Sequence, residues 1–185
     1  MAENTQIQRP RWLNEDEQRT WRAYLLATRL LMEQFERDLQ ADAGIPLTYY
    51  EILGRLSEAP DRTLRMSRLA DELLASRSRL SHAVARLEEM GWVRREQCPG
   101  DRRGALAVMT DEGFAALKEA APGHVESVRR HLFDQLTPEQ LDELREVSER
   151  LRDHLVSSLG LTCPTELGDP TPCAGTPSTS SEYPS

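Results

Sequence analysis

The hydrophobic positions of residues 77–90 repeat with helical periodicity and fall on one side of the predicted helix. At about 100° per residue, Leu80, Val84 and Leu87 share one face. The opposite face is small, hydroxylic and cationic, and its polar residues are concentrated in the first two turns. One face is therefore expected to pack, whereas the other can approach a polar surface closely.

A predicted β-hairpin follows this helix. Residues 98–104 contain one proline and two glycines, which is typical of a hairpin loop. The two strands are expected at residues 92–97 and 105–109. Arg102 and Arg103 lie at the tip, and Asp101 is close enough to hold the Arg103 guanidinium in one pose. A basic β-loop beside a basic helix indicates a winged helix-turn-helix, whose helix enters the major groove of DNA while its wing reaches a neighbouring minor groove or the backbone.

Apolar residues spaced three or four apart predict five further helices, which gives six in all. We place them at residues 15–42, 49–59, 67–74, 111–133 and 138–159. Several helix starts carry residues that cap a helix. The expected N-caps are Asn14, Thr48 (with Glu51 as a capping box), Ser76, Thr110 and Thr137. Leu69, Leu73 and Leu74 are expected in the core, and a bend is possible near Pro122 and Gly123.

The predicted fold is therefore mainly α, an α+β winged helix-turn-helix with six helices and a wing sheet of two to three strands. The first and last helices have apolar stripes that a small domain cannot fully bury alone. They either form an intermolecular dimerisation bundle or wrap within one chain. The expected organisation is an N-terminal segment and dimerisation helix (1–46), a DNA-binding lobe (47–110), C-terminal dimerisation helices (111–160) and a disordered tail rich in Pro, Ser and Thr (161–185).

Two stretches, LRMSRLADELLASRSRLSHAVARLEEMGWVRRE and GDRRGALAVMTDEG, resemble the MarR (multiple antibiotic resistance regulator) family of bacterial transcription regulators. The wing is the most specific part, with Asp-x-Arg, a short apolar strand, and then Thr, an acidic residue and Gly. The resemblance covers roughly residues 15–161. It implies a homodimer that binds a pseudo-palindromic operator, more usually as a repressor. It also implies a small aromatic or anionic effector bound between the dimer helices and the DNA-binding lobe. For the first and last helices, the resemblance favours the intermolecular bundle over wrapping within one chain.

The charge distribution qualifies the DNA-binding hypothesis. The chain has 185 residues and a net charge of −8, so phosphate repels it on average. Residues 76–104, however, carry seven arginines and four carboxylates, a local net charge of +3. Because charges are screened over about 8 Å at physiological salt, a basic face can dominate its own contact. Such a pattern can also be an ordinary solvated face.

Other classes of function find little support in the sequence. The three cysteines (98, 163 and 173) are odd in number and form no Cys-x-x-Cys, which argues against a disulfide scaffold or a zinc site. We expect no metal, no cofactor and no enzymatic activity, because there is no glycine-rich phosphate loop, ligand cluster or nucleophile elbow. Without a signal peptide or a long apolar run, a cytoplasmic location and no membrane partner are expected.

The candidate DNA-binding residues lie on the helix and the wing. They are Ser76, Arg77, Ser78, Arg79, Ser81, His82, Arg86, Asp101, Arg102 and Arg103. Ser76 can instead serve only as an N-cap, and His82 can be a solvated helix residue. If Arg103 contacts phosphate, Arg103→Ala is expected to weaken binding and flatten its salt dependence by about one unit of slope.

The aromatic residues near the expected effector crevice are weaker candidates. They are Trp21, Tyr24, Tyr49 and Tyr50, and each can equally belong to the core. Arg29, Arg62 and Arg65 could pair with a carboxylate. Two alternative functions stay open: a winged-helix module that binds protein, and a redox-responsive regulator that uses Cys98. Cys98 is expected to be exposed at the base of the wing, where an inert thiol is the simpler interpretation.

Overall fold

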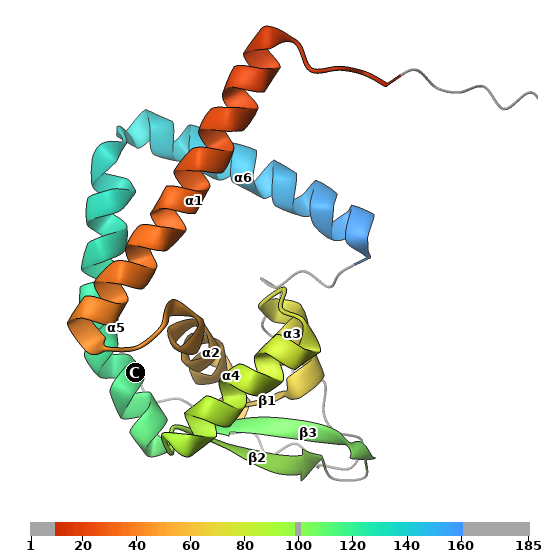
Figure 1. Cartoon of the computed structure of the whole chain (residues 1–185), viewed down its shortest axis with the longest axis vertical. Coiled ribbons are helices and arrows are strands. Elements are labelled where there is room, and N and C mark those ends of the chain that lie inside the picture. The colour runs from red at the N-terminus through yellow and green to blue at the C-terminus, as the bar shows by residue number, and fades with distance from the viewer. Residues whose placement is uncertain (1–9, 99–100, 161–185) are drawn as a thin grey trace, which may run out of the picture. The chain divides into compact units, whose positions relative to one another are not determined.

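The computed structural model describes residues 10–98 and 101–160. The chain divides into two compact units, residues 1–34 and 35–185, and each is described by itself. The helices are α1 (Glu15–Ala43), α2 (Leu47–Glu58), α3 (Met66–Glu72), α4 (Arg77–Glu89), α5 (Asp111–His131) and α6 (Pro138–Leu159) (Figure 1). Short 3₁₀ turns lie at η1 (Pro60–Arg62) and η2 (Phe133–Gln135). The strands are β1 (Thr63–Arg65), β2 (Val93–Cys98) and β3 (Asp101–Met109).

The three strands form one antiparallel sheet in the order β1-β3-β2. Thr63 pairs with Val108 on one side of β3, and Val93 pairs with Met109 on the other. Six helices beside a small sheet confirm the predicted mainly α, winged helix-turn-helix fold. Strand β3 is longer than expected, because residues 101–104 of the predicted loop belong to it, and β2 is displaced by one residue so that it includes Cys98.

Most of the predicted helix starts are confirmed by their capping hydrogen bonds. The Ser76 hydroxyl accepts a hydrogen bond from the Arg79 amide at 3.3 Å. The Thr110 hydroxyl accepts one from the Gly113 amide at 3.0 Å. At α6, Thr137 and Gln140 form a capping box. These side chains satisfy amides that the first turn of a helix leaves without a partner.

The predicted cap of α2 is wrong. The helix begins at Leu47, two residues earlier than expected, and its N-cap is Pro46 without a side-chain hydrogen bond. The carboxylate of Glu36 in α1 accepts a hydrogen bond from the Leu47 amide at 2.7 Å. A tertiary contact therefore replaces the local Thr48 capping box. Such a contact between residues far apart in the sequence cannot be predicted from the local pattern.

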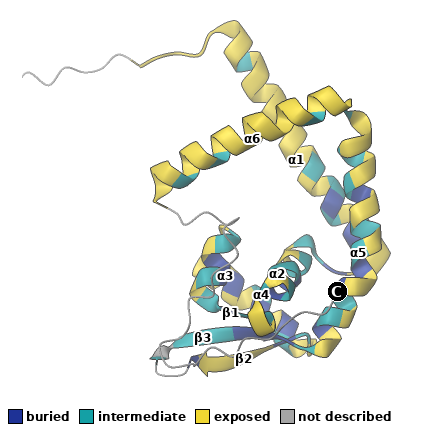
Figure 2. Cartoon of the chain, turned by 180° about the vertical axis from the view of Figure 1, so that it is seen from behind, coloured by how far each residue is buried: buried dark blue, intermediate teal, exposed yellow. Residues whose placement is uncertain are grey.

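The core joins α2, α3, α4 and the sheet, and its exposure is mapped in Figure 2. Its largest fully buried side chains are Ile52, Leu53, Leu56, Leu69, Val84 and Leu87. The prediction for Leu74 is wrong, because this side chain is 72% exposed. Helix α3 ends at Glu72, so Leu74 falls in the following turn with φ +49°, away from the apolar face of the helix.

The start of α5 is held tightly against the residues that follow α4. The Thr110 amide donates to the Trp92 carbonyl at 3.0 Å, and the Thr110 hydroxyl donates to the Gly91 carbonyl at 2.7 Å. A Cβ atom on Gly113 would lie 2.1 Å from the Trp92 carbonyl oxygen. Only glycine fits at this close approach, which explains the glycine of the Thr-Asp-Glu-Gly sequence.

Farther along, α5 continues through Pro122 as a single helix and contacts the end of α1. The Ser127 hydroxyl donates to the Asp38 carboxylate at 2.6 Å, and His131 Nε2 lies 3.0 Å from the same oxygen. The His124 ring lies 4.4 Å from the Tyr50 ring and 5.7 Å from the Phe35 ring, centroid to centroid. Burial among these rings lowers the pKa of His124.

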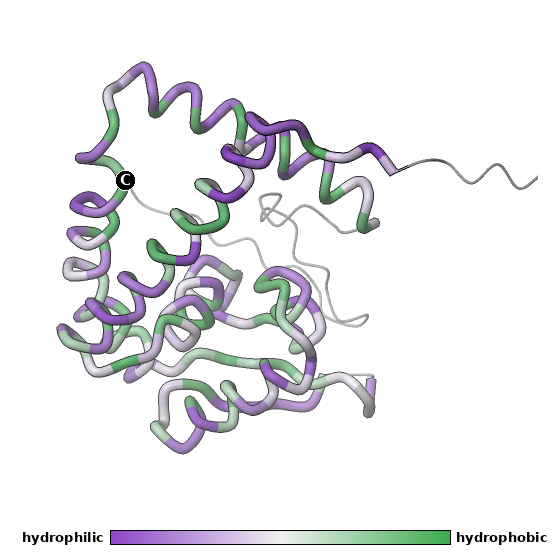
Figure 3. Tube along the Cα trace, turned by 45° about the horizontal axis from the view of Figure 1, so that its top comes forward, coloured by the Kyte–Doolittle hydropathy of each residue, from purple (hydrophilic) through white to green (hydrophobic). Residues whose placement is uncertain are grey.

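Helix α6 has no buried residue. Its exposed apolar side chains recur at Leu144, Val147, Leu151, Leu155 and Leu159. They lie on one side of the helix, because these spacings of three and four follow the helical repeat. Figure 3 shows the alternation of hydrophobic and hydrophilic segments along the helices. Within residues 10–98 and 101–160, no helix combines the length and apolar character needed to cross a membrane.

Candidate nucleic-acid interface

Helix α4 presents the polar face that the sequence predicts. Its first two turns expose Arg77, Ser78, Arg79, Ser81 and His82, while the opposite face enters the core. Arg77 and Arg79 form no ion pair with any other residue in the described part of the chain. Two guanidinium groups at the start of this helix are thus available for an anionic partner.

The other arginine predicted on α4 differs from these two. The Arg86 guanidinium lies 2.6 Å from Glu89, and both side chains are largely exposed. Hydrogen bonding and charge from Glu89 raise the pKa of Arg86. A carboxylate partner already satisfies this side chain, so contact with DNA would require it to change partner.

A shallow cleft of about 290 Å³ lies between the start of α4 and the sheet. Guanidinium groups from three elements line it: Arg65 at the end of β1, Arg77 on α4 and Arg95 on β2. The remaining lining residues are Met66, Ser67, Ser81, Gly104 and Ala105. Arg65 and Arg95 already pair with Asp101 and Glu88, whereas Arg77 has no carboxylate partner among the described residues. Arg77 is therefore the guanidinium of this cleft that is available to an anionic group such as phosphate.

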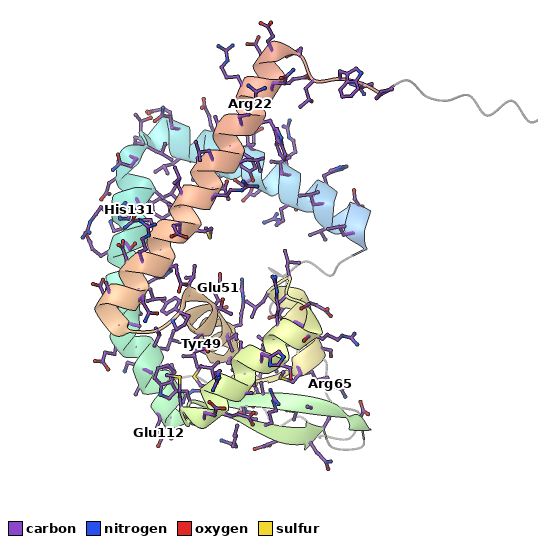
Figure 4. The ribbon with its side chains drawn as sticks, in the orientation of Figure 1. Arg22, Tyr49, Glu51, Arg65, Glu112 and His131 are labelled. Carbon is purple, nitrogen blue, oxygen red and sulfur yellow. The ribbon has the colours of Figure 1, made fainter. Side chains whose placement is uncertain are left out.

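Asp101 adopts a role that the sequence does not indicate. Its carboxylate lies 3.4 Å from the guanidinium of Arg65, so it links the wing to β1. Arg65 is labelled in Figure 4. The side chains of Arg102 and Arg103 lie outside the described residues, although both positions belong to β3. Positioning of Arg103 by Asp101 stays a prediction.

The aromatic candidates occupy different surroundings. Tyr49 lines a second, open cleft of about 690 Å³ together with His82 and Arg86, between α2 and α4. Tyr50 instead packs against His124, and burial raises the pKa of its hydroxyl. Trp21 and Tyr24 belong to the first unit and are 52% and 53% exposed.

Two candidate cations for the effector carboxylate already have partners. Arg62 lies 2.9 Å from Asp111 and 3.9 Å above the centre of the Phe114 ring. Arg65 pairs with Asp101, as described above. An effector at either position would have to displace an existing carboxylate.

Sequence reasoning missed Arg95 altogether, and it considered Arg65 only as a partner for an effector carboxylate and not as a residue of the candidate nucleic-acid interface. A signal for Arg95 was available, because side chains alternate along a strand. Val93 faces the core, so Arg95 two residues later shares its face, whereas Arg94 points to the other face. No comparable local signal marks Arg65, whose place depends on the pairing of β1 with β3.

The expectation for Cys98 is wrong. The side chain is only 3% exposed, and its sulfur takes part in a disulfide. Cys98 lies where the register of β2 against β3 shifts, and this irregularity turns it inward. The other two cysteines, Cys163 and Cys173, lie outside the described residues.

The helix-turn-helix formed by α3 and α4, followed by a cationic two-stranded wing, defines a winged helix-turn-helix protein. Residues 43–104 match the profile of the MarR family. The chain is similar to the solved structure of Sco3205, a MarR family transcriptional regulator from Streptomyces coelicolor in complex with DNA. The two sequences are 53% identical, and the structures superpose with a TM-score of 0.76. The similarity covers 79% of this chain and 91% of that one.

Two further relatives support the same assignment. AbsC, a MarR family transcriptional regulator from Streptomyces coelicolor, is 46% identical over 80% of this chain and 99% of its own, with a TM-score of 0.74. The HTH-type transcriptional regulator PecS of Dickeya dadantii is 35% identical over 50% of this chain. The matched region covers 55% of PecS. The chain belongs to the MarR family of transcriptional regulators, a family of regulators rather than enzymes.

Proposed function

We propose that this chain is a sequence-specific DNA-binding regulator that acts as a homodimer on a pseudo-palindromic operator. Helix α4 of each protomer enters a major groove, and the two helices lie one turn of DNA apart, about 34 Å. The wing reaches a neighbouring minor groove or the backbone through Arg102 and Arg103. Ser76, Ser78, Ser81 and His82 approach the base edges or phosphates.

The observation that carries this proposal is the pair of unpaired guanidinium groups, Arg77 and Arg79, at the start of an exposed helix. They lie beside a cleft that two further arginines line. A stability role would favour pairing these cations with the many carboxylates of an acidic chain. Their freedom is instead what recognition of phosphate or guanine requires. The DNA complex of Sco3205, at 53% identity, supports the same function.

The exposed apolar stripe of α6 supports the proposed homodimer. Four leucines and a valine that face solvent form a surface that a second copy of the same helix can cover. We therefore assign residues 111–160 to dimerisation, together with residues 1–46, and residues 47–110 to DNA binding. The tail, residues 161–185, for which the composition predicts disorder, lies outside the described residues.

Repression and release by a small aromatic or anionic effector complete the proposal. The effector would favour a dimer geometry that no longer fits the operator, and so shift the population away from the DNA-bound state. Tyr49, which lines the second cleft, supplies aromatic surface for such a molecule. Trp21, Tyr24 and Tyr50 stay candidates from the sequence alone.

The test is fluorescence anisotropy of the full chain with DNA that flanks its own gene, across a salt series, against a random duplex. We expect saturable binding of one dimer, tighter than to random DNA and steeply dependent on salt. Phenolic acids are then added to the bound complex to test release. Absence of binding even at low salt would overturn the proposal and favour the protein-interaction module.

A further inference from the structure

The guanidinium of Arg95 is directed at α4 rather than at solvent. Its Nη2 donates to the Ser81 carbonyl at 2.6 Å and lies 3.4 Å from the Ser81 hydroxyl. Its Nε lies 3.2 Å from the Glu88 carboxylate. The Arg95 amide donates to the other Glu88 oxygen at 3.0 Å. One residue of β2 therefore holds two points of α4 that are seven residues, about two turns, apart.

We infer that Arg95 positions the recognition helix on the wing, through a clamp that consists of Arg95, Ser81 and Glu88. The inference rests on the proposed DNA binding and names a positioning residue for it. Two anchors separated along the helix axis fix both its distance from β2 and its angle to β2. A single anchor would leave the angle free.

The partners of Arg95 argue against a direct phosphate contact. Its charge faces the Glu88 carboxylate, and each side chain is about one-third exposed, 32% and 31%. Arg77, which lines the same cleft, has no carboxylate partner among residues 10–98 and 101–160. The two arginines thus divide the work: Arg77 is available for DNA, whereas Arg95 keeps α4 in place.

The structure also explains why an arginine is needed here. A guanidinium is planar and carries five N–H donors, so it can bond a carboxylate and a carbonyl at the same time in a fixed geometry. A lysine would keep the positive charge but would lack the planar arrangement of N–H donors. Arg95→Lys is therefore expected to restore only part of the function of the clamp.

Glu88→Gln gives the sharpest test, because the two possible roles of the pair predict opposite signs. If the pair acts only through its charge, removal of a carboxylate beside DNA raises operator affinity. If the clamp positions α4, the variant loses affinity. We expect a loss of about threefold to tenfold for Glu88→Gln and at least tenfold for Arg95→Gln. The double variant should resemble Arg95→Gln, since both changes break one device.

The salt dependence separates positioning from phosphate contact. Arg95→Gln should keep the wild-type slope, whereas Arg77→Gln should lower it by about 0.9 for each protomer, or about 1.8 for the dimer. Arg94→Gln is the matched control, because Arg94 is on the other face of the same strand and bonds Glu96 at 2.7 Å. It should stay within twofold of the wild type. Thermal unfolding checks that each variant is folded.

A measurement on the free protein makes the inference independent of DNA. Residual dipolar couplings of amides in α4 and β2 report the angle between the two elements. We expect this angle to change or become heterogeneous in Arg95→Gln and to be unchanged in Arg94→Gln. Unchanged couplings, a gain of affinity in Glu88→Gln, or a lowered slope in Arg95→Gln would each overturn the clamp. Failure of the wild type to bind DNA would overturn the proposed function, while the couplings would still decide the clamp.

Discussion

The winged-helix lobe, from α2 to β3, and helix α6 treat their apolar residues in opposite ways. In the lobe, leucines such as Leu53 and Leu87 are fully buried by other elements of the same chain. In α6, the leucines that follow the helical repeat face outward, and Leu159 is 66% exposed. The lobe therefore buries its apolar residues within one chain, whereas the stripe of α6 is left exposed. Burial within the lobe stabilises the fold, and the proposed function assigns the exposed stripe to dimerisation.

Gly113→Ala should disturb the lobe most. Its Cβ would lie 2.1 Å from the Trp92 carbonyl oxygen, so the start of α5 has to move away from the sheet. We expect the free energy of unfolding to fall by about 2–3 kcal/mol, measured by chemical denaturation. Gly54→Ala is the control, because nothing lies within 4 Å of its Cβ and alanine favours a helix. Equal effects of the two changes would contradict the close approach.

Leu151→Glu should disturb assembly and spare the lobe. A carboxylate in the apolar stripe of α6 has to be desolvated when a second copy covers it. We expect the dissociation constant of the dimer to rise at least tenfold, measured by analytical ultracentrifugation, with little change in the circular dichroism of the monomer. Ser157→Glu adds the same charge on the other side of α6 and should leave the dimer intact. A dimer unaffected by Leu151→Glu would show that another surface joins the protomers.

Arg77→Gln should disturb DNA binding alone. Loss of one phosphate contact per protomer weakens operator affinity and lowers the salt slope by about 0.9 for each contact. Fluorescence anisotropy at several salt concentrations measures both effects. Arg150→Gln removes an arginine from α6, far along the chain from the winged-helix lobe, and should leave the slope unchanged. A slope that does not respond to Arg77→Gln would remove this residue from the interface.

The pH dependence of stability gives a smaller effect, at the contact of α5 with α1 and α2. Burial lowers the pKa of His124, so the unfolded chain takes up a proton at higher pH than the folded chain. The free energy of unfolding should therefore decrease as pH falls through about 6.5, the ordinary pKa of histidine.

His124→Phe should flatten this decrease between about pH 7.5 and 5.5, measured by chemical denaturation at each pH. Tyr50→Phe keeps the ring that contacts His124 and should keep the dependence. A decrease that survives in His124→Phe would assign it to another group.

Local patterns predicted the local structure well. The caps at Ser76, Thr110 and Thr137 and the apolar face of α4 follow from neighbouring residues, and the structure confirms them. The errors occur where distant residues decide. Glu36 caps α2 from another helix, and the turn after Glu72 exposes Leu74. The inward orientation of the Cys98 side chain depends on a register shift between β2 and β3. Alternation along β2 would have identified the face of Arg95, but its partner Glu88 becomes apparent only when α4 lies against β2.

Helix α5 is held at both ends, so it can transmit a movement from one end to the other. Its first turn is fastened to Gly91 and Trp92 directly after α4, and its last turns contact Asp38 of α1. Its 21 residues make a lever about 30 Å long. A tilt of about 10° about one end displaces the other by about 5 Å, which exceeds the ~3.4 Å step between base pairs. A rotation of this size is therefore large enough to move α4 out of phase with the DNA sequence that it contacts under the proposed function.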